Sequence, residues 1–156
     1  MKKMKRVIVG LMALGMAFTM TACGGKEQTV TYRNETETSG IKTTDTMTFT
    51  AKGDIVEKLT EVIEFDISSF DDATKEQFNS TYEELVAQYN DIEGVNCTMT
   101  AGDDTITFNI DVDTTGDAVN ELTEKNLLTM EGGGSGKISL KASAASLEST
   151  GYEKVE

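Results

Sequence analysis

The sequence predicts an α+β fold: an antiparallel β-sheet meander packed against one long amphipathic helix, with shorter helices towards the C-terminus. Three observations lead to this prediction. Apolar and polar residues alternate over several stretches, which is typical of strands with one buried face. One segment instead carries its aromatic residues at helical spacing. Short clusters of Gly, Asp and Ser separate these segments and predict turns.

Two strands are predicted first. Val30 and Tyr32 begin an alternating stretch, and residues 46–51 alternate in the same way with Thr on the opposite face. Between them, Ser39-Gly40 has the composition of a turn. The two stretches are therefore expected to lie side by side.

The next predicted strand covers residues 55–66 and follows a turn at Lys52-Gly53-Asp54. Most of its apolar residues fall on odd positions, so one face is expected to be buried. Glu61 interrupts the alternation. We expect a bulge or an exposed edge at this residue.

A hairpin is predicted in the second half of the chain. Residues 95–101 and 105–112 both alternate, and Gly102-Asp103-Asp104 lies between them. Cys97 falls within the first of these strands. A buried strand position is its expected role, because free Cys is among the most buried residue types.

The long helix is predicted to begin at an N-cap formed by Asp72 or Thr74. Its apolar stripe has the spacing i, i+4, i+7 and i+11. The residues of this stripe are Phe78, Tyr82, Leu85 and Tyr89. Aromatic residues at this spacing indicate a core-facing surface rather than a ligand site.

The C-terminal part is predicted to contain two shorter helices. Residues 117–130 form the first, and the glycine-rich residues 131–136 form a flexible loop after it. Ser139 caps the last helix and Gly151 ends it. The remaining Tyr152 and Val155 are expected to fold back on the core.

The N-terminus has the pattern of a secretory leader: a basic segment, then an apolar run over residues 7–18, then small residues. The run is about half the roughly 20 residues that a spanning helix needs. Met20-Thr21-Ala22 before Cys23 resembles the lipobox of bacterial lipoproteins. We therefore predict a signal peptide over 1–22, a lipidated Cys23 with a polar tether over 23–28, and a single domain over 29–156. The alternatives are a non-lipidated signal with a coincidental cysteine and an uncleaved hydrophobic tail.

The predicted location is extracytoplasmic, at the cell membrane or envelope, with the membrane contacted through palmitate and other acyl chains on Cys23. Four of the 14 basic residues lie in the leader, so ten basic and 27 acidic side chains remain in the mature chain. The resulting net charge of about −17 argues against nucleic acid as a partner and against lying flat on an anionic membrane.

Catalysis has little support in the sequence. The chain has no His, which removes the commonest general base and neutral metal ligand. Cys97 therefore cannot pair with a His as a nucleophile. We predict that the protein is not an enzyme and holds no cofactor, apart from a calcium hypothesis.

Calcium is suggested by residues 111–117, which place oxygen-bearing side chains as in the start of an EF-hand loop. Asp111, Asp113 and Thr115 would supply side-chain oxygens and Asp117 its backbone carbonyl. Position 12 of the motif is Leu122 instead of the bidentate Glu. The alternative is a strand-to-helix turn with an Asx cap.

The order of these parts resembles the YehR-like family of small bacterial lipoproteins. The resemblance covers essentially the whole chain: the lipobox, the Thr- and Tyr-rich first strand, the strand that opens on Lys-Gly-Asp, residues 89–95 (Tyr-Asn-Asp-Ile-Glu-Gly-Val) and residues 150–155. It implies an α+β lipoprotein domain with no assigned activity. Among functional residues, only Cys23 corresponds to one of the family.

Three functional hypotheses follow. The first is a non-enzymatic surface lipoprotein that binds a partner or supports an envelope assembly, either in a groove between helix and sheet or at an exposed edge such as Thr29 to Glu35. The second is a carrier of a small ligand or a cation such as calcium. The third is an unfamiliar hydrolase. The sequence does not identify the protein partner or ligand.

Overall fold

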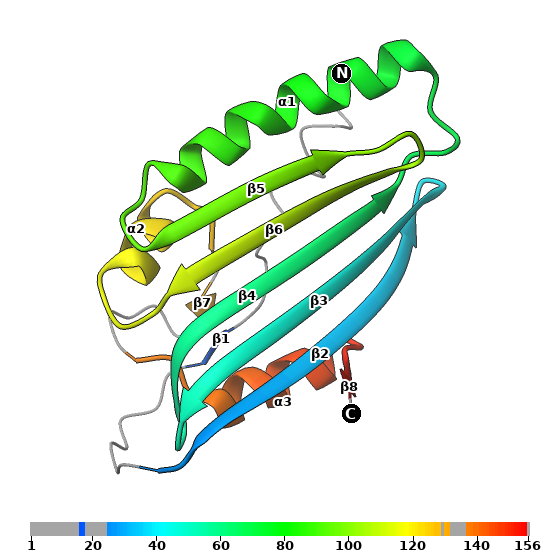
Figure 1. The fold of residues 1–156 in the computed structure, drawn as a ribbon. Helices are drawn as coiled ribbons and strands as arrows, with labels where there is room; N and C mark the ends of the chain where they lie inside the picture. The colour runs from blue at the N-terminus through cyan, green and yellow to red at the C-terminus, as the bar shows by residue number, and fades with distance from the viewer. Residues whose placement is uncertain (1–15, 18–24, 129, 132–136, 156) are drawn as a thin grey trace.

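The computed structural model describes residues 16–17, 25–128, 130–131 and 137–155, and it has the predicted α+β architecture. A six-stranded sheet carries its helices on one face (Figure 1). The elements are β1 (Met16–Ala17), β2 (Glu27–Thr38), β3 (Ile41–Lys52), β4 (Ile55–Asp66), α1 (Asp72–Asn90), β5 (Val95–Ala101), β6 (Thr105–Asp113), α2 (Ala118–Glu124), β7 (Met130–Glu131), α3 (Leu140–Ser149) and β8 (Glu153–Val155).

The strands are ordered β5-β6-β4-β3-β2-β8, and neighbouring strands are antiparallel. β2, β3 and β4 form the predicted meander. After α1, the hairpin of β5 and β6 joins the sheet through β6, which leaves β5 at the edge. β1 and β7 form a separate parallel pair, and β1 lies in the predicted leader.

The predicted turn at Ser39-Gly40 is confirmed. Both residues have positive φ angles, 56° and 82°, which is the backbone of a type I′ hairpin turn. Thr38 and Ile41 are paired in register on either side of it. This two-residue connection fixes the register of β2 against β3 over their full length.

The expectation of a bulge or exposed edge at Glu61 is wrong. The irregularity in the β3–β4 pairing lies between Thr50 and Ala51. Glu61 is instead paired with Met47 on β3 and with Ile110 on β6, and its exposed fraction is 0%. The alternation of β4 is therefore intact at this point, and an acidic side chain occupies an inward-facing position in the middle of the sheet.

Helix α1 begins at Asp72, which is one of the two residues predicted as its N-cap. The N-cap is Asp71, whose Oδ1 accepts a hydrogen bond of 2.7 Å from the backbone N–H of Thr74. The predicted apolar stripe is confirmed, because all four of its residues are buried. The Tyr82 ring lies 4.8 Å from the ring of Phe108 on β6, centroid to centroid, which places α1 on the inner face of the sheet.

The last residue of α1 also covers the outer edge of β5. The side-chain amide of Asn90 donates to the backbone oxygen of Cys97 at 2.8 Å and accepts from its backbone N–H at 2.7 Å. These are the two hydrogen bonds that a further strand would make. Asn90 thus protects an edge that would otherwise offer unpaired backbone groups to another chain.

Helix α2 is shorter than predicted, since it ends at Glu124 and not near Met130. Asn126 has a φ of 56°, and the N–H of Leu127 bonds to the oxygen of Leu122 at 2.8 Å. This is a Schellman motif with Asn in the place of the usual Gly. Because Asn tolerates this left-handed conformation, it ends the helix without a glycine in the sequence to indicate it.

The last helix, α3, has both predicted boundaries. The Ser139 side chain accepts from the N–H of Ala142 at 3.2 Å, and Gly151 has a φ of 94° after the last turn. Tyr152 packs against the core as expected, but Val155 is 43% exposed on the edge strand β8. Of the predicted loop over 131–136, residues 132–136 lie outside the described residues.

Candidate functional site

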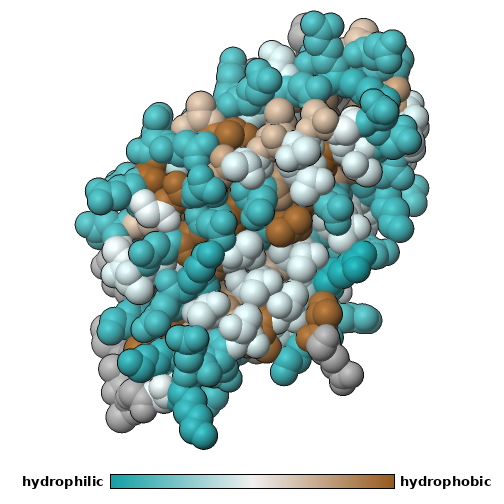
Figure 2. Space-filling model, viewed as in Figure 1, coloured by the Kyte–Doolittle hydropathy of each residue, from teal (hydrophilic) through white to brown (hydrophobic). Residues whose placement is uncertain are grey.

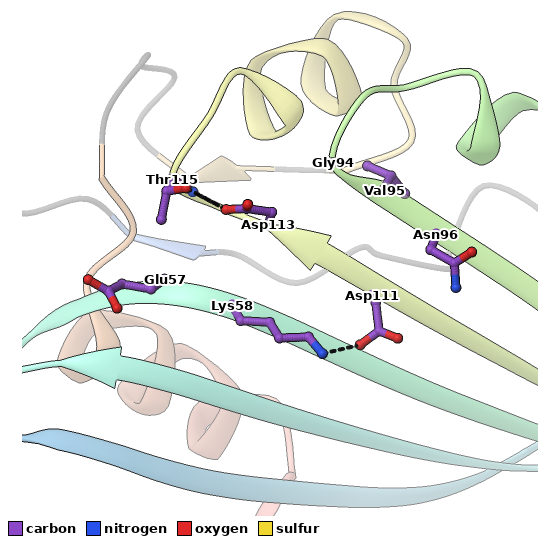
Figure 3. A pocket seen from close by; sticks show the side chains of 8 residues that line it. All are labelled: Glu57, Lys58, Gly94, Val95, Asn96, Asp111, Asp113 and Thr115. Carbon is purple, nitrogen blue, oxygen red and sulfur yellow. Dashed lines mark hydrogen bonds and ion pairs between the residues drawn. The ribbon is translucent and has the colours of Figure 1, made fainter.

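An open cleft lies on the outer face of the sheet, where β4 and β6 approach the start of β5 (Figure 3). Its volume is about 480 Å³. Carboxylate, amide, hydroxyl and ammonium groups all contribute to its wall. The lining residues are Glu57, Lys58, Gly94, Val95, Asn96, Asp111, Asp113 and Thr115.

Asp111 is positioned by its pairing partner on β4. Thr60 lies opposite it in register and donates a hydrogen bond of 2.6 Å to Asp111 Oδ1. The same oxygen forms an ion pair of 3.0 Å with the Nζ of Lys58. The hydrogen bond from Thr60, together with Lys58, holds the pKa of Asp111 below its usual range, although partial burial opposes this.

Asp113 forms a local turn at the end of β6. Its Oδ1 accepts from the N–H of Thr115 at 2.9 Å and from the hydroxyl of the same residue at 2.6 Å. These hydrogen bonds lower the pKa of Asp113. Asp111 and Asp113 are therefore ionised at neutral pH, so they can attract a cation but cannot act as general acids.

The calcium hypothesis places three of its four residues, Asp111, Asp113 and Thr115, in this cleft. Asp117 is not among the lining residues, and its Oδ1 accepts a hydrogen bond of 3.1 Å from the side chain of Asn120 at the start of α2. Within the described ranges, no group of three or more His, Cys, Asp or Glu side chains is arranged to hold a metal. Glu57 adds a carboxylate that the linear motif did not include.

The second surface feature is the whole outer face of the sheet. Side chains that point to this face alternate with buried ones, as the burial pattern of β4 and β6 shows. In Figure 1, α3 lies behind the sheet and α1 runs along its β5 edge. Threonines dominate its middle. Thr31, Thr48 and Thr60 are in register on three adjacent strands, and Thr46 pairs with Val62 in the next row. We call these four threonines, together with Val62, the threonine rows.

The threonine rows are uncharged although the mature chain carries a net charge of about −17. Figure 2 shows pale side chains of intermediate hydropathy across the middle of this face. The hydroxyls of Thr31 and Thr48 are hydrogen-bonded to each other at 3.0 Å. Side chains on adjacent strands of this face lie close together, since strands of a sheet are spaced only about 4.8 Å apart.

The other two predicted binding places are partly or wholly filled. β8 pairs with Thr31 to Arg33, so the predicted edge from Thr29 to Glu35 is partly occupied. The space between α1 and the sheet is filled by the aromatic core, in which Phe65 contacts Phe78 and Tyr82.

Cys97 is buried in β5, as predicted, with 2% exposure. Burial raises the pKa of its thiol to about 11, so it is not a nucleophile at neutral pH. The predicted lipidation site, Cys23, lies outside the described residues. Among the helices described, none has the length and apolar character needed to cross a membrane.

Residues 28–153 match the family described as "Protein of unknown function (DUF1307)". The chain belongs to this family. Its relatives include two uncharacterized lipoproteins, from Listeria monocytogenes and Listeria innocua. Each is 30% identical to this chain, and the alignments cover 99% and 100% of it and 99% of each relative. The predicted membership of a family of lipoproteins without assigned activity is thus confirmed.

Two solved structures share the fold. The NMR structure of the YehR protein of E. coli is 23% identical with a TM-score of 0.59, and the match covers 85% of this chain and 94% of that one. The NMR structure of a protein from Streptococcus pneumoniae TIGR4 is 13% identical with a TM-score of 0.50, over 90% and 92% of the two chains. Both proteins therefore share the α+β fold of this chain.

Proposed function

We propose that this DUF1307 protein is a lipid-anchored, extracytoplasmic binding module without enzymatic activity, and that it binds its partner on the open face of the sheet. The lipoprotein relatives support the anchor. The single observation that carries the binding proposal is the set of threonine rows, which form an uncharged centre on a strongly acidic protein. Acidic side chains would be the expected occupants if this face served solubility alone.

The chemistry of the rows defines what they can bind. Each Thr hydroxyl can donate and accept one or more hydrogen bonds, and each methyl group offers a small apolar contact. A partner of low charge can use these hydrogen bonds and apolar contacts, whereas a strongly charged partner gains no ion pairs from the centre of the rows. Arg33 and Lys58 border them and provide charges at the rim.

Site-specific photo-cross-linking in the full-length, membrane-attached protein tests this proposal. A photoreactive residue at Thr48 is expected to give a discrete adduct, and one at Gln88, on the exposed side of α1, is expected to give none. Thr60→Lys should abolish the Thr48 adduct, while Gln88→Lys should leave it unchanged. Equal adducts from both positions, or none from Thr48, would count against the open face as the binding surface.

The anchor is tested separately. Cys23→Ser should remove the incorporation of radiolabelled palmitate and move the protein from the membrane to the soluble fraction, because several acyl chains are needed for stable attachment. The matched variant Cys97→Ser should retain both the label and the membrane association. Palmitate incorporation that persists in Cys23→Ser contradicts the assignment.

Calcium binding in the cleft is a second candidate, because Glu57, Asp111 and Asp113 all line one open cavity, although among the described residues their carboxylates do not form a ready-made group for a metal. A ligand that binds only the folded protein adds about 2.7 kcal/mol to its stability at 100 times its Kd, so calcium should raise the melting temperature by several degrees relative to chelator. Asp113→Ala should abolish that shift. An unchanged melting temperature in millimolar calcium rejects this candidate.

A further inference from the structure

The inner face of the sheet buries a carboxyl group whose oxygens have no partner. Glu61 has 0% exposure, and neither Oε1 nor Oε2 accepts or donates a hydrogen bond in the described part of the chain. Its paired neighbours, Met47 and Ile110, are apolar and buried. An ionised carboxylate without partners in such a place costs several kcal/mol, so its protonation state needs an explanation.

Asp45 provides that explanation. It lies two residues before Met47 on β3 and thus on the same inner face, diagonal to Glu61. Its Oδ2 accepts a hydrogen bond of 2.7 Å from the hydroxyl of Tyr152, which precedes β8. Its Oδ1 is buried and has no partner. The two carboxyl groups interact with each other, and we call them the acid pair.

We propose that Glu61 retains its proton at neutral pH and uses it to donate a hydrogen bond to Asp45 Oδ1, so that the acid pair carries one negative charge and forms a pH-sensitive element in the fold. One proton placed in this way satisfies the free oxygen of Asp45 and removes the charge from the more deeply buried group. It leaves Asp45 as the acceptor of two hydrogen bonds, one from Glu61 and one from Tyr152.

The electrostatics agree with this placement. Burial is the largest cause that raises the pKa of Glu61 well above its usual value, and the charge of Asp45 raises it further. Burial also raises the pKa of Asp45, from 3.8 to about 6, although the hydrogen bond from Tyr152 and the proposed one from Glu61 oppose this. Two carboxyl groups that share one proton are expected to separate their pKa values in this direction.

The other titratable groups around the pair are also acids. Tyr89 on α1, Cys97 on β5 and Tyr152 each interact electrostatically with Glu61, and burial raises the pKa of each. Tyr32 on β2 interacts with Glu148 on α3. The phenols and the thiol are neutral at neutral pH, so they cannot compensate an ionised Glu61.

The effect on stability has a defined sign. Because the pKa values of both acids are raised in the folded state, their stabilisation is fully present in acid and is lost as the pH rises. For Asp45 the loss occurs between about pH 4 and pH 6, and for Glu61 it follows at higher pH. A shift of two pKa units corresponds to roughly a hundredfold change in the folding equilibrium constant.

Carboxyl-carbon NMR of the uniformly labelled, mature protein in detergent micelles tests the proton directly. The signals of Asp45 and Glu61 can be assigned from Asp45→Asn and Glu61→Gln, and Glu64 on the outer face of β4 is the internal control. We expect Asp45 to titrate near pH 6 and Glu61 to stay protonated through neutral pH. A Glu61 signal that titrates together with that of Glu64 would overturn the proposal.

Unfolding experiments supply a second readout. Wild type and Glu64→Gln should both lose stability from pH 5 to pH 8. Glu61→Gln mimics the protonated acid at every pH, so its stability should match that of wild type at pH 5 and should decrease less at alkaline pH. If Glu61→Gln and Glu64→Gln have the same pH profile, the acid pair does not hold the proposed proton.

Discussion

The two faces of the sheet place the same type of residue, a glutamate, in opposite environments. Glu64 and Glu61 lie three residues apart on β4, but Glu64 is exposed on the outer face and Glu61 is sealed on the inner face. Water solvates the first, whereas the second depends on one neighbouring carboxyl group. The face on which a glutamate lies, and not the residue type, therefore decides whether water or buried protein groups surround its carboxyl group.

The faces also differ in how they contribute to stability and to binding. Inward side chains pack in the aromatic core, with Phe65 at its centre among Phe78, Tyr82 and Phe108. Outward side chains form the threonine rows, which no helix among the described residues covers. Substitutions on the inner face should therefore affect folding, and substitutions on the outer face should affect partners.

The largest expected contrast comes from adjacent residues on β6. Phe108→Ala removes a ring that is 1% exposed and should lower the free energy of unfolding by about 3–5 kcal/mol. Asn109→Ala, one residue later on the outer face, should change it by less than about 0.5 kcal/mol. Urea denaturation measures both. Similar midpoints for the two variants would contradict the assignment of the faces.

A smaller loss of stability is expected from a substitution at the N-cap of α3, a helix on the inner side of the sheet. Ser139 is buried at the start of α3; its hydroxyl accepts from the N–H of Ala142 and donates to Asp54 Oδ2 at 2.8 Å. Ser139→Ala should cost about 1 kcal/mol through loss of the cap. Thermal unfolding should give a lower melting temperature for Ser139→Ala than for the matched Ser149→Ala, which lies at the exposed end of the helix. If Ser139→Ala leaves the melting temperature unchanged, the cap does not stabilise α3.

The pH dependence of stability should have opposite signs for exposed carboxyl groups and for the acid pair on the inner face. Hydrogen bonds from Ser68 and Thr74 lower the pKa values of the exposed Asp66 and Asp71, so their stabilisation is present above about pH 4 and is lost in stronger acid. The acid pair has the opposite sign. The melting temperature should therefore be highest in mild acid, between about pH 4 and pH 6. A maximum at pH 8 would be incompatible with this balance.

The smallest effect is predicted at Thr60. Thr60→Ala removes the hydrogen bond to Asp111 and should change stability by no more than about 0.5 kcal/mol. The pKa of Asp111 should rise towards its usual value, which carboxyl-carbon NMR can follow. Thr46→Ala, which has no such bond to Asp111 among those described, is the control and should leave this pKa unchanged.

Local patterns predicted most of the elements. The alternation in β3 to β6, the stripe of α1, the Ser39-Gly40 turn and the two boundaries of α3 depend on near neighbours in the chain, and the structure confirms them. The end of α2 was missed because Asn126 adopts a left-handed conformation that is usually taken by Gly.

Long-range pairing was less accessible from the sequence. The burial of Glu61 depends on Asp45 sixteen residues earlier and on Tyr152 near the C-terminus, and no local pattern joins them. The cleft shows the same limit: Asp111 and Asp113 were singled out as oxygen ligands, but Glu57 and Lys58 reach them only through the pairing of β4 with β6.

The close contact at the start of β2 has a consequence for how the domain stands on a bilayer. Lys26 accepts a hydrogen bond of 3.1 Å from Gly53, and a side chain at Gly25 would come within 2.4 Å of the Gly53 Cα. With Cys23 acylated, two Cα steps, roughly 7 Å of chain, separate the lipids from this fixed point. The β3–β4 turn would then rest near the lipid headgroups, and the strands would run outward, holding the threonine rows side-on to the membrane.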